Sequence, residues 1–233
     1  PTVHKKWNDS VAILSGDAML IQAYELLFTY SFDNLHEIMQ FFNETALKVC
    51  EGQQYDMNFQ HDSTVTVEKY LMMIELKTAA LIAASLKIGA MLAGAAPDTV
   101  QQIYQFGKNI GIAFQLQDDL LDAFADQESF GKKIGGDIVE NKKTFLLLTL
   151  LEQATANDKK IVLDCMERAT YDPDEKIKTI KSLYYHYDVK SLTERKIKHY
   201  FNVSVSELEK IDMPADKKTT LYEFSELLFK RSS

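Results

Sequence analysis

The sequence has few of the residues that build tight turns or disulfides. Its 233 residues include only 9 glycines and 4 prolines, too few for the many turns that an all-β fold needs. The two cysteines, Cys50 and Cys165, form neither a disulfide framework nor a metal-ligand spacing, and the chain starts with no signal-peptide pattern. These absences favour a helical protein in a reducing cytoplasm.

Charge and hydropathy argue against two classes of partner. The formal net charge is −8 at pH 7. Proteins that bind a phosphate backbone carry an excess of positive charge, so we expect no nucleic-acid partner. The longest uncharged apolar stretches, such as residues 88–97 and 144–151, are shorter than the ~18–20 residues that cross a bilayer. We therefore expect no transmembrane segment.

Apolar residues recur at helical spacing along almost the whole chain, for example at Tyr70, Met73, Ile74 and Leu81. The two sizeable interruptions, residues 51–66 and 126–141, do not alternate with a period of two for long enough to be strands. We predict a single all-α domain. Its helices are predicted at residues 9–31, 33–51, 66–93, 98–125, 142–156, 158–169, 173–187, 190–200, 206–212 and 216–231.

Three local patterns predict where helices begin. Asp172 precedes Pro173 and a nearby glutamate, as expected for an N-cap acid followed by proline at the first helical position. Asp98 with Gln101 and Ser204 with Glu207 have the spacing of reciprocal capping pairs.

Three carboxylates follow an apolar helical run. Asp118 and Asp122 are four residues apart and share a helix face, whereas Asp119 lies about 100° round the helix. At ~5–6 Å and an effective dielectric near 20, two such charges repel by roughly 3 kcal/mol, which a divalent cation would turn into attraction. An oxygen site with few protein ligands suits Mg²⁺. The alternative for this pattern alone is a solvated acidic helix face.

Lysines follow this acidic helix end in a glycine-rich segment. Lys132 and Lys133 come after Gly131, and Lys142 lies further along, so the loop could bring ammonium groups over a metal-bound diphosphate. Lys77 lies within an apolar helical segment, where an ammonium needs an anion or must extend to solvent. Carboxylates for metal together with lysines for phosphate are typical of diphosphate chemistry.

These segments, in this order and spacing, resemble the trans-isoprenyl diphosphate synthases, which form the polyprenyl synthetase family. The resemblance is strong over about residues 1–150 and fades to general helical character beyond them. The matching segments are residues 1–7, 16–19, 52–56, 77–79, 114–122 and 131–144.

The resemblance implies an isoprenoid-synthase-type helical bundle around a central cavity, usually a homodimer, which joins isopentenyl diphosphate head-to-tail to an allylic diphosphate. It implies that Asp118 and Asp122 ligate Mg²⁺, with Asp119 as a nearby helper. The implied diphosphate-binding residues are Lys77, Lys142 and either Lys132 or Lys133.

The resemblance also implies roles along the hydrocarbon part of the substrates. Thr78, Gln115 and the Lys77 carbonyl would face the developing carbocation, and Phe114 would contact the isopentenyl chain. Gln53 and Asp56 match polar positions that line the same cavity.

The 233 residues depart from the family pattern in one respect. Members carry two Asp-rich motifs, and here only the second is found; no arginine precedes Arg168, so the arginine pair that follows the first motif is missing too. We therefore expect a polyprenyl synthetase domain over residues 1–233 that lacks its N-terminal helices through truncation, and that is inactive or severely impaired alone. The alternatives are a non-catalytic regulatory subunit of a heteromeric prenyl synthase and, less favoured, a terpene cyclase.

Overall fold

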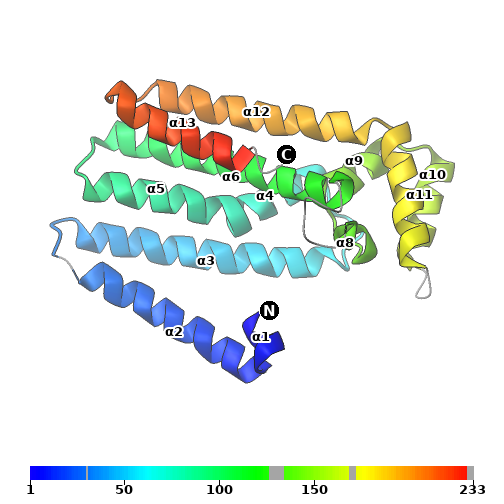
Figure 1. The fold of residues 1–233 in the computed structure, drawn as a ribbon, viewed down its shortest axis with the longest axis horizontal. Helices are drawn as coiled ribbons and strands as arrows, with labels where there is room; N and C mark the ends of the chain where they lie inside the picture. Colours follow the sequence, from blue (N-terminus) through cyan, green and yellow to red (C-terminus); the bar gives the residue numbers. More distant parts are fainter. Residues whose placement is uncertain (30, 126–133, 168–171, 230–233) are drawn as a thin grey trace. The chain divides into compact units, whose positions relative to one another are not determined.

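The computed structural model describes residues 1–29, 31–125, 134–167 and 172–229, and every regular element within these ranges is a helix. The prediction of an all-α fold is therefore confirmed. Figure 1 shows the helices in chain order from blue to red.

The chain divides into two compact units, Pro1–Asn43 and Glu44–Ser233, and the boundary falls inside helix α3 (Leu35–Phe59). The first unit holds α1 (Val3–Lys6), α2 (Asp9–Phe28) and the start of α3. Within it, the Tyr24 hydroxyl on α2 donates to Asn43 Oδ1 on α3 at 2.5 Å.

Helix α2 is, among the described residues, the one helix long and apolar enough by length and composition to cross a membrane, and none of its residues is buried. It contains no long uncharged run, because Asp9, Asp17 and Glu25 lie along it. The absence of a transmembrane segment stays a prediction.

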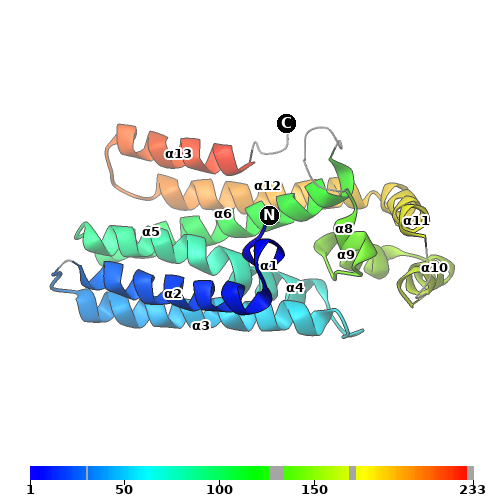
Figure 2. The ribbon, with the colours of Figure 1, turned by 60° about the horizontal axis from the view of Figure 1, so that its bottom comes forward.

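In the second unit, helix α6 contacts α5 and α12, and the two views show these three helices running side by side (Figures 1 and 2). Gly107 and Gly111 on α6 permit this close packing, since a Cβ at either would meet the backbone of Ala83 or Ala79 within 2.8 Å. The unit's helices after α3 are α4 (Val67–Ile74), η1 (Glu75–Ala79), α5 (Ala80–Leu92), α6 (Pro97–Phe124), α8 (Gly136–Val139), α9 (Phe145–Gln153), α10 (Ala156–Glu167), α11 (Pro173–His186), α12 (Val189–Glu209) and α13 (Ala215–Phe229).

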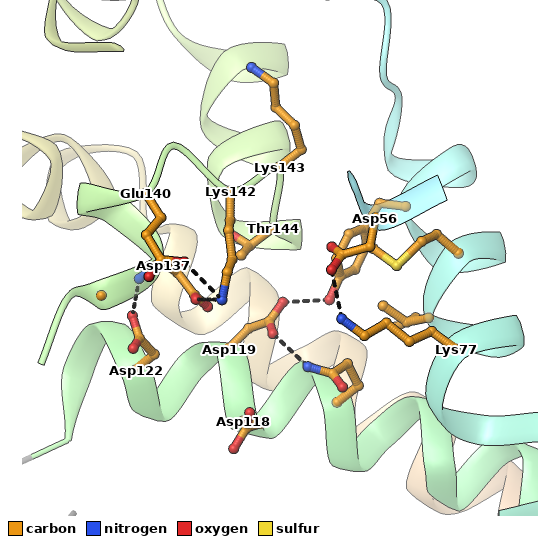
Figure 3. A pocket seen from close by; sticks show the side chains of 15 residues that line it. Asp56, Lys77, Asp118, Asp119, Asp122, Asp137, Glu140, Lys142, Lys143 and Thr144 are labelled. Atoms are coloured by element: carbon orange, nitrogen blue, oxygen red, sulfur yellow. Dashed lines mark hydrogen bonds and ion pairs between the residues drawn. The ribbon is translucent and has the colours of Figure 1, made fainter. Parts of the chain in front are cut away.

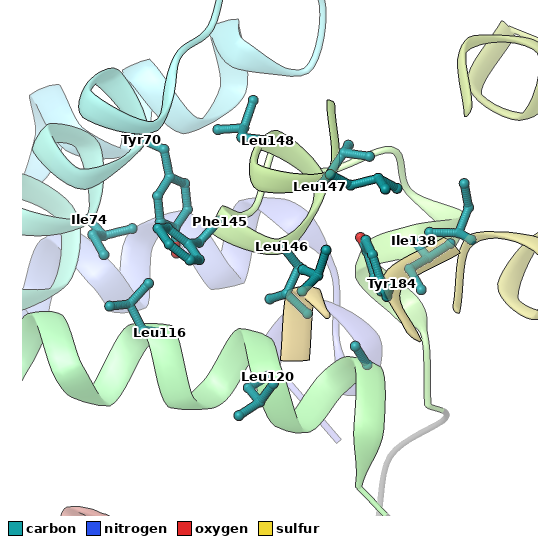
Figure 4. Close-up of a cluster of buried hydrophobic side chains, with 14 of the residues drawn as sticks. Tyr70, Ile74, Leu116, Leu120, Ile138, Phe145, Leu146, Leu147, Leu148 and Tyr184 are labelled. Carbon is teal, nitrogen blue, oxygen red and sulfur yellow. The ribbon is translucent and has the colours of Figure 1, made fainter. Parts of the chain in front are cut away.

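The main core lies where α4, α6 and α9 meet (Figure 4). Leu116 and Leu120 are four residues apart and present one face of α6 to Tyr70 and Ile74 of α4. The short helix α9 contributes a continuous buried apolar run, and each such side chain stabilises the fold by roughly 1.5–3 kcal/mol. This core supports the C-terminal half of α6, where the three carboxylates lie.

The predicted helices agree with the structure except at three places, and the two four-residue helices α1 and α8 lie where no helix is predicted. Helix α3 continues to Phe59 through the predicted interruption, and η1 is a π-helical turn inside the predicted 66–93 helix. The predicted 190–200 and 206–212 helices are one helix, α12. Its residues 201–205 are poor helix formers, but Ser204 and Leu208 are fully buried, so tertiary packing overrides local propensity.

One of the three capping predictions is confirmed. The Asp172 carboxylate accepts from the backbone N–H groups of Asp174 and Glu175 at 2.9 and 3.0 Å. The other two are wrong: α6 begins at Pro97 with Ala96 as its N-cap, and Ser204 lies inside α12, where its hydroxyl donates to the Phe201 carbonyl.

Candidate functional site

A cavity of about 410 Å³ opens among α3, α4, η1, the end of α6 and the turn around α8, all within the second unit (Figure 3). Charged groups of both signs line it. Its walls are formed by Asp56, Tyr70, Met73, Ile74, Lys77, Gln115, Asp118, Asp119, Asp122, Gly136, Asp137, Glu140, Lys142, Lys143 and Thr144.

Lys77 enters the cavity from the π-helical turn η1. Its ammonium donates to Asp56 Oδ2 on α3 at 2.6 Å, and both side chains are partly buried. One turn before Asp56, Gly52 lets α3 approach η1, since a Cβ at this glycine would lie 2.4 Å from the Lys77 backbone nitrogen. Backbone contact between two helices therefore fixes where Lys77 projects.

A chain of hydrogen bonds connects η1 with the acidic end of α6. The Thr78 hydroxyl donates to Gln115 Oε1 at 2.8 Å, Gln115 Nε2 donates to Asp119 Oδ1 at 3.0 Å, and the Tyr70 hydroxyl donates to Asp119 Oδ2 at 2.5 Å. Figure 3 marks the two hydrogen bonds that Asp119 accepts with dashed lines. The carboxylate is thus held from both sides.

Burial of Asp119 and Tyr70 has a clear electrostatic consequence. Burial raises the pKa of Asp119 to about 7, although the hydrogen bonds from Tyr70 and Gln115 lower it in part. Burial, together with the charge of Asp119, raises the pKa of Tyr70 well above its ordinary value. Near neutral pH and without a bound cation, Asp119 is therefore close to half protonated.

Asp122 accepts hydrogen bonds from the turn around α8. Its backbone carbonyl accepts from the Gly135 N–H at 2.7 Å, and its Oδ2 accepts from the Asp137 N–H at 3.0 Å. Gly135 has φ +80°, a left-handed conformation that favours glycine. Burial raises the pKa of Asp122, and the Asp137 N–H partly offsets this. These bonds bring residues 135–144 over the end of α6.

Lys142 enters the cavity from this turn. Its ammonium donates to Asp137 Oδ1 at 2.5 Å and lies 3.5 Å from Glu140 Oε2. Burial alone would lower the pKa of Lys142, but the hydrogen bond and charge of Asp137 outweigh burial and raise it. The neighbouring Lys143 has a pKa lowered by burial. Lys142 is therefore a permanent positive charge at the cavity.

The carboxylates suit a cation that takes few protein ligands. Asp118 is exposed, Asp122 is half-buried, and the negative charge of Asp118 contributes to the raised pKa values of Asp119 and Asp122. No three His, Cys, Asp or Glu side chains within the described ranges converge closely enough to hold a metal ion by themselves. Mg²⁺ fits such a site, because it is usually held by one or two carboxylates together with waters and substrate phosphates.

The structure brings most of the predicted site residues to this cavity. Asp56, Lys77, Gln115, Lys142 and the three carboxylates of residues 118–122 line it. Lys132 and Lys133 lie outside the described residues. Three predicted residues do not line the cavity, namely Gln53, Phe114 and Thr78. Gln53 is exposed on α3, and Phe114 is half-buried. Thr78 is connected to the cavity only by its hydrogen bond to Gln115, which lines it.

Sequence reasoning missed several lining residues. Tyr70, Met73 and Ile74 share a helix face with Lys77, so the helical spacing around Lys77 could have identified them. Asp137 lies in the glycine-rich segment itself, and the local sequence indicates no role for it. Its pairing with Lys142 has no signal in the sequence.

Comparison with known proteins gives consistent results. The family model for polyprenyl synthetase matches residues 1–183. A short chain isoprenyl diphosphate synthase of Methanothermobacter thermautotrophicus is 38% identical over 167 residues, which cover 71% of this chain and 51% of the relative. The chain thus spans about half the length of that relative.

Two solved structures share the fold. A geranylgeranyl pyrophosphate synthase superposes with a TM-score of 0.92 at 40% identity, over 100% of this chain and 72% of that one. A polyprenyl synthase from Caulobacter crescentus, in complex with calcium and isoprenyl diphosphate, superposes with a TM-score of 0.88 at 25% identity, over 99% of this chain and 69% of that one.

Proposed function

Because this chain belongs to the polyprenyl synthetase family, we propose that it forms part of a prenyltransferase that joins isopentenyl diphosphate head-to-tail to an allylic diphosphate and releases diphosphate. One observation supports this most directly. Ammonium groups from two separate segments, Lys77 on η1 and Lys142 on the turn after α8, face the same cavity as the carboxylates of α6.

The lysines and carboxylates would share the task of stabilising the leaving diphosphate. Asp118 and Asp122 would hold Mg²⁺, which when bound supplies positive charge against the diphosphate oxygens. Lys77 and Lys142 would donate charge-assisted hydrogen bonds to the same oxygens. Fixed positive groups in a partly closed cavity stabilise developing negative charge more strongly than they would in water.

The wall between Lys77 and the carboxylates would face the allylic carbon. The side-chain oxygen of Gln115, which accepts from the Thr78 hydroxyl at 2.8 Å, would orient its dipole toward the positive charge that develops as the bond to diphosphate breaks. The buried side chains of Met73 and Ile74 would limit access of water to this carbon.

The exposed apolar helix α2 agrees with a homodimer, which we propose as the assembled form. Its exposed side chains include Leu14 at 67% and Met19 at 68% of their accessible surface, and a second copy would bury such groups. Sedimentation analysis of the wild type and a Leu14→Glu variant would test this: we expect a dimer that the substitution disrupts, and a wild-type monomer would contradict it.

The binding of inorganic pyrophosphate tests the proposed site directly. By titration calorimetry, we expect binding that requires Mg²⁺ and that is weakened about tenfold or more by Asp122→Asn or Lys142→Met. Lys178→Met, an exposed lysine of α11 that does not line this cavity, is the matched control and should bind like the wild type. Binding that ignores Mg²⁺ or both cavity substitutions would refute the proposal.

The same experiment separates the alternatives. A non-catalytic regulatory subunit has no need of a functional Mg²⁺ and diphosphate site, so its binding would not depend on Asp122 and Lys142. A terpene cyclase would bind pyrophosphate but would not add isopentenyl diphosphate to an allylic diphosphate. Since these 233 residues contain one of the family's two acidic motifs, we expect prenyl transfer by the chain alone to be absent or severely reduced; turnover at ordinary synthase rates would contradict this expectation.

A further inference from the structure

Lys176 is the one basic residue that is buried among those the structure describes, with 6% of its surface exposed. It lies in the first part of α11 and does not line the candidate site cavity. An ammonium group removed from water costs free energy unless hydrogen bonds replace its hydration, and burial lowers the pKa of Lys176 accordingly. Such a residue requires specific partners.

Its partners are oxygens of the segment that connects α8 with α9. The Lys176 ammonium donates to the Val139 backbone carbonyl at 3.0 Å and to Asn141 Oδ1 at 2.5 Å. The Asn141 amide group in turn donates to the Met166 carbonyl of α10 at 3.0 Å. Asn141 has φ +59°, an uncommon conformation for a residue with a side chain. Its side chain is hydrogen-bonded to both α10 and α11.

Lys142 follows Asn141 directly, so the conformation of Asn141 determines where Lys142 emerges. The Lys142 N–H donates to the Asp137 carbonyl at 3.0 Å, and its ammonium donates to the Asp137 carboxylate. Asp137 is connected through its own N–H to Asp122 on α6. Lys176 thus binds two oxygens of the turn that carries Lys142 to the cavity.

We infer that Lys176 is a positioning residue, which acts through Val139 and Asn141 to hold Lys142 in the place where it meets a diphosphate. The inference rests on the proposed function of Lys142. Without the ammonium of Lys176, the Val139 carbonyl and the Asn141 side-chain oxygen lose their donor, and the strained turn gains alternative conformations. Lys142 then spends less time in the orientation that binds the anion.

A double-mutant cycle tests this inference, with magnesium-dependent pyrophosphate affinity as the readout. We expect Lys176→Met to weaken binding about tenfold in the wild-type background but by less than about twofold in a Lys142→Met background. Lys178→Met, two residues away on the same helix and exposed, is the matched control and should change the affinity by less than about twofold. Urea unfolding of every variant reports stability separately.

Asn141→Gly covers the case in which Lys176→Met does not fold. Glycine adopts the positive φ readily, so this variant keeps the backbone conformation and removes the oxygen that accepts from Lys176. We expect it to weaken binding by about threefold or more, again only while Lys142 is present.

The possible results decide the question. Equal losses of affinity with and without Lys142 would overturn the inference, because they would indicate general destabilisation. An unchanged affinity in Lys176→Met or Asn141→Gly would overturn it as well. A wild-type chain that does not bind magnesium and pyrophosphate at all would instead refute the proposed function, together with this inference.

Discussion

The two lysine–aspartate pairs at the cavity have the same chemistry but are held in different ways. Lys77 meets Asp56, 21 residues away on another helix, at 2.6 Å; Lys142 meets Asp137, five residues away within one turn, at 2.5 Å. The side chains have similar exposures, 34% and 21% in the first pair and 37% and 19% in the second. The difference lies in the scaffold behind each lysine.

Behind Lys77 the scaffold is backbone packing. Gly52 on α3 and Gly111 on α6 bring both helices against η1, since a Cβ at either position would approach η1 backbone atoms to 2.4 and 2.6 Å. Behind Lys142 the scaffold is polar, namely the bonds that Lys176 and Asn141 make across the turn. Steric changes should therefore disturb the first pair, and removal of hydrogen bonds should disturb the second.

Enlarging Gly52 should have the largest effect on stability. We expect Gly52→Ala to lower the free energy of unfolding by about 3 kcal/mol, because the added Cβ overlaps the backbone of Lys77 and neither helix can yield easily. Urea unfolding followed by circular dichroism measures this change.

The matched control is Gly89→Ala in α5. A Cβ there meets no atom within 4 Å, so this substitution should leave stability unchanged or raise it by up to about 1 kcal/mol through helix propensity. If Gly52→Ala were as stable as the wild type, packing of α3 against η1 would not be what holds Lys77.

Asp119, which lies between the two pairs in Figure 3, should make stability depend on pH. Its pKa of about 7 in the folded state lies above the ordinary 3.8, so the folded protein keeps a proton that the unfolded chain releases. The resulting stability is fully present below about pH 4 and is lost as the pH rises through 7. Between pH 5 and 8 in magnesium-free buffer, we expect a loss of roughly 2.5 kcal/mol.

Two substitutions assign this pH dependence to Asp119. Asp119→Asn removes the titrating group, so the decline between pH 5 and 8 should be smaller by that amount than in the wild type. Asp118→Asn changes the neighbouring exposed carboxylate and should keep the wild-type decline. A decline of equal size in all three proteins would show that other groups cause it.

Helical spacing explains how much of the site could be predicted. The positions of Asp118 and Asp122 on one face of α6, and of Lys77 within a helix, follow from the local sequence, because a helix fixes the relations of residues three and four apart. The all-α fold follows from the same periodicity and from the scarcity of glycine and proline.

Contacts between distant segments could not be predicted in this way. The bond from Tyr70 to Asp119 joins residues 49 apart, and the bond from Lys176 to Asn141 joins residues 35 apart. The continuous helix α12 also depends on distant packing, since Ser204 and its neighbours favour a helix break by local propensity alone. These features depend on how the helices pack, which the pattern of one segment does not contain.

Removing each lysine should test whether the two pairs act independently. We expect Lys77→Met and Lys142→Met each to weaken magnesium-dependent pyrophosphate binding by about tenfold, or ~1.4 kcal/mol, and together by about a hundredfold. Because the lysines are held by separate scaffolds, their effects should add. A double variant no weaker than either single one would show that the two lysines act as one unit.

The smallest effect should come from the ion pair at the start of η1. Glu75 Oε1 lies 3.3 Å from Lys108 Nζ, and the side chains are 41% and 25% exposed, so solvent screens their attraction. We expect Glu75→Gln to change the free energy of unfolding by less than about 1 kcal/mol and to leave pyrophosphate affinity unchanged. A loss above about 2 kcal/mol would mean that charge, and not the close contacts of Gly52 and Gly111, holds η1, and the contrast between the two scaffolds would then fail.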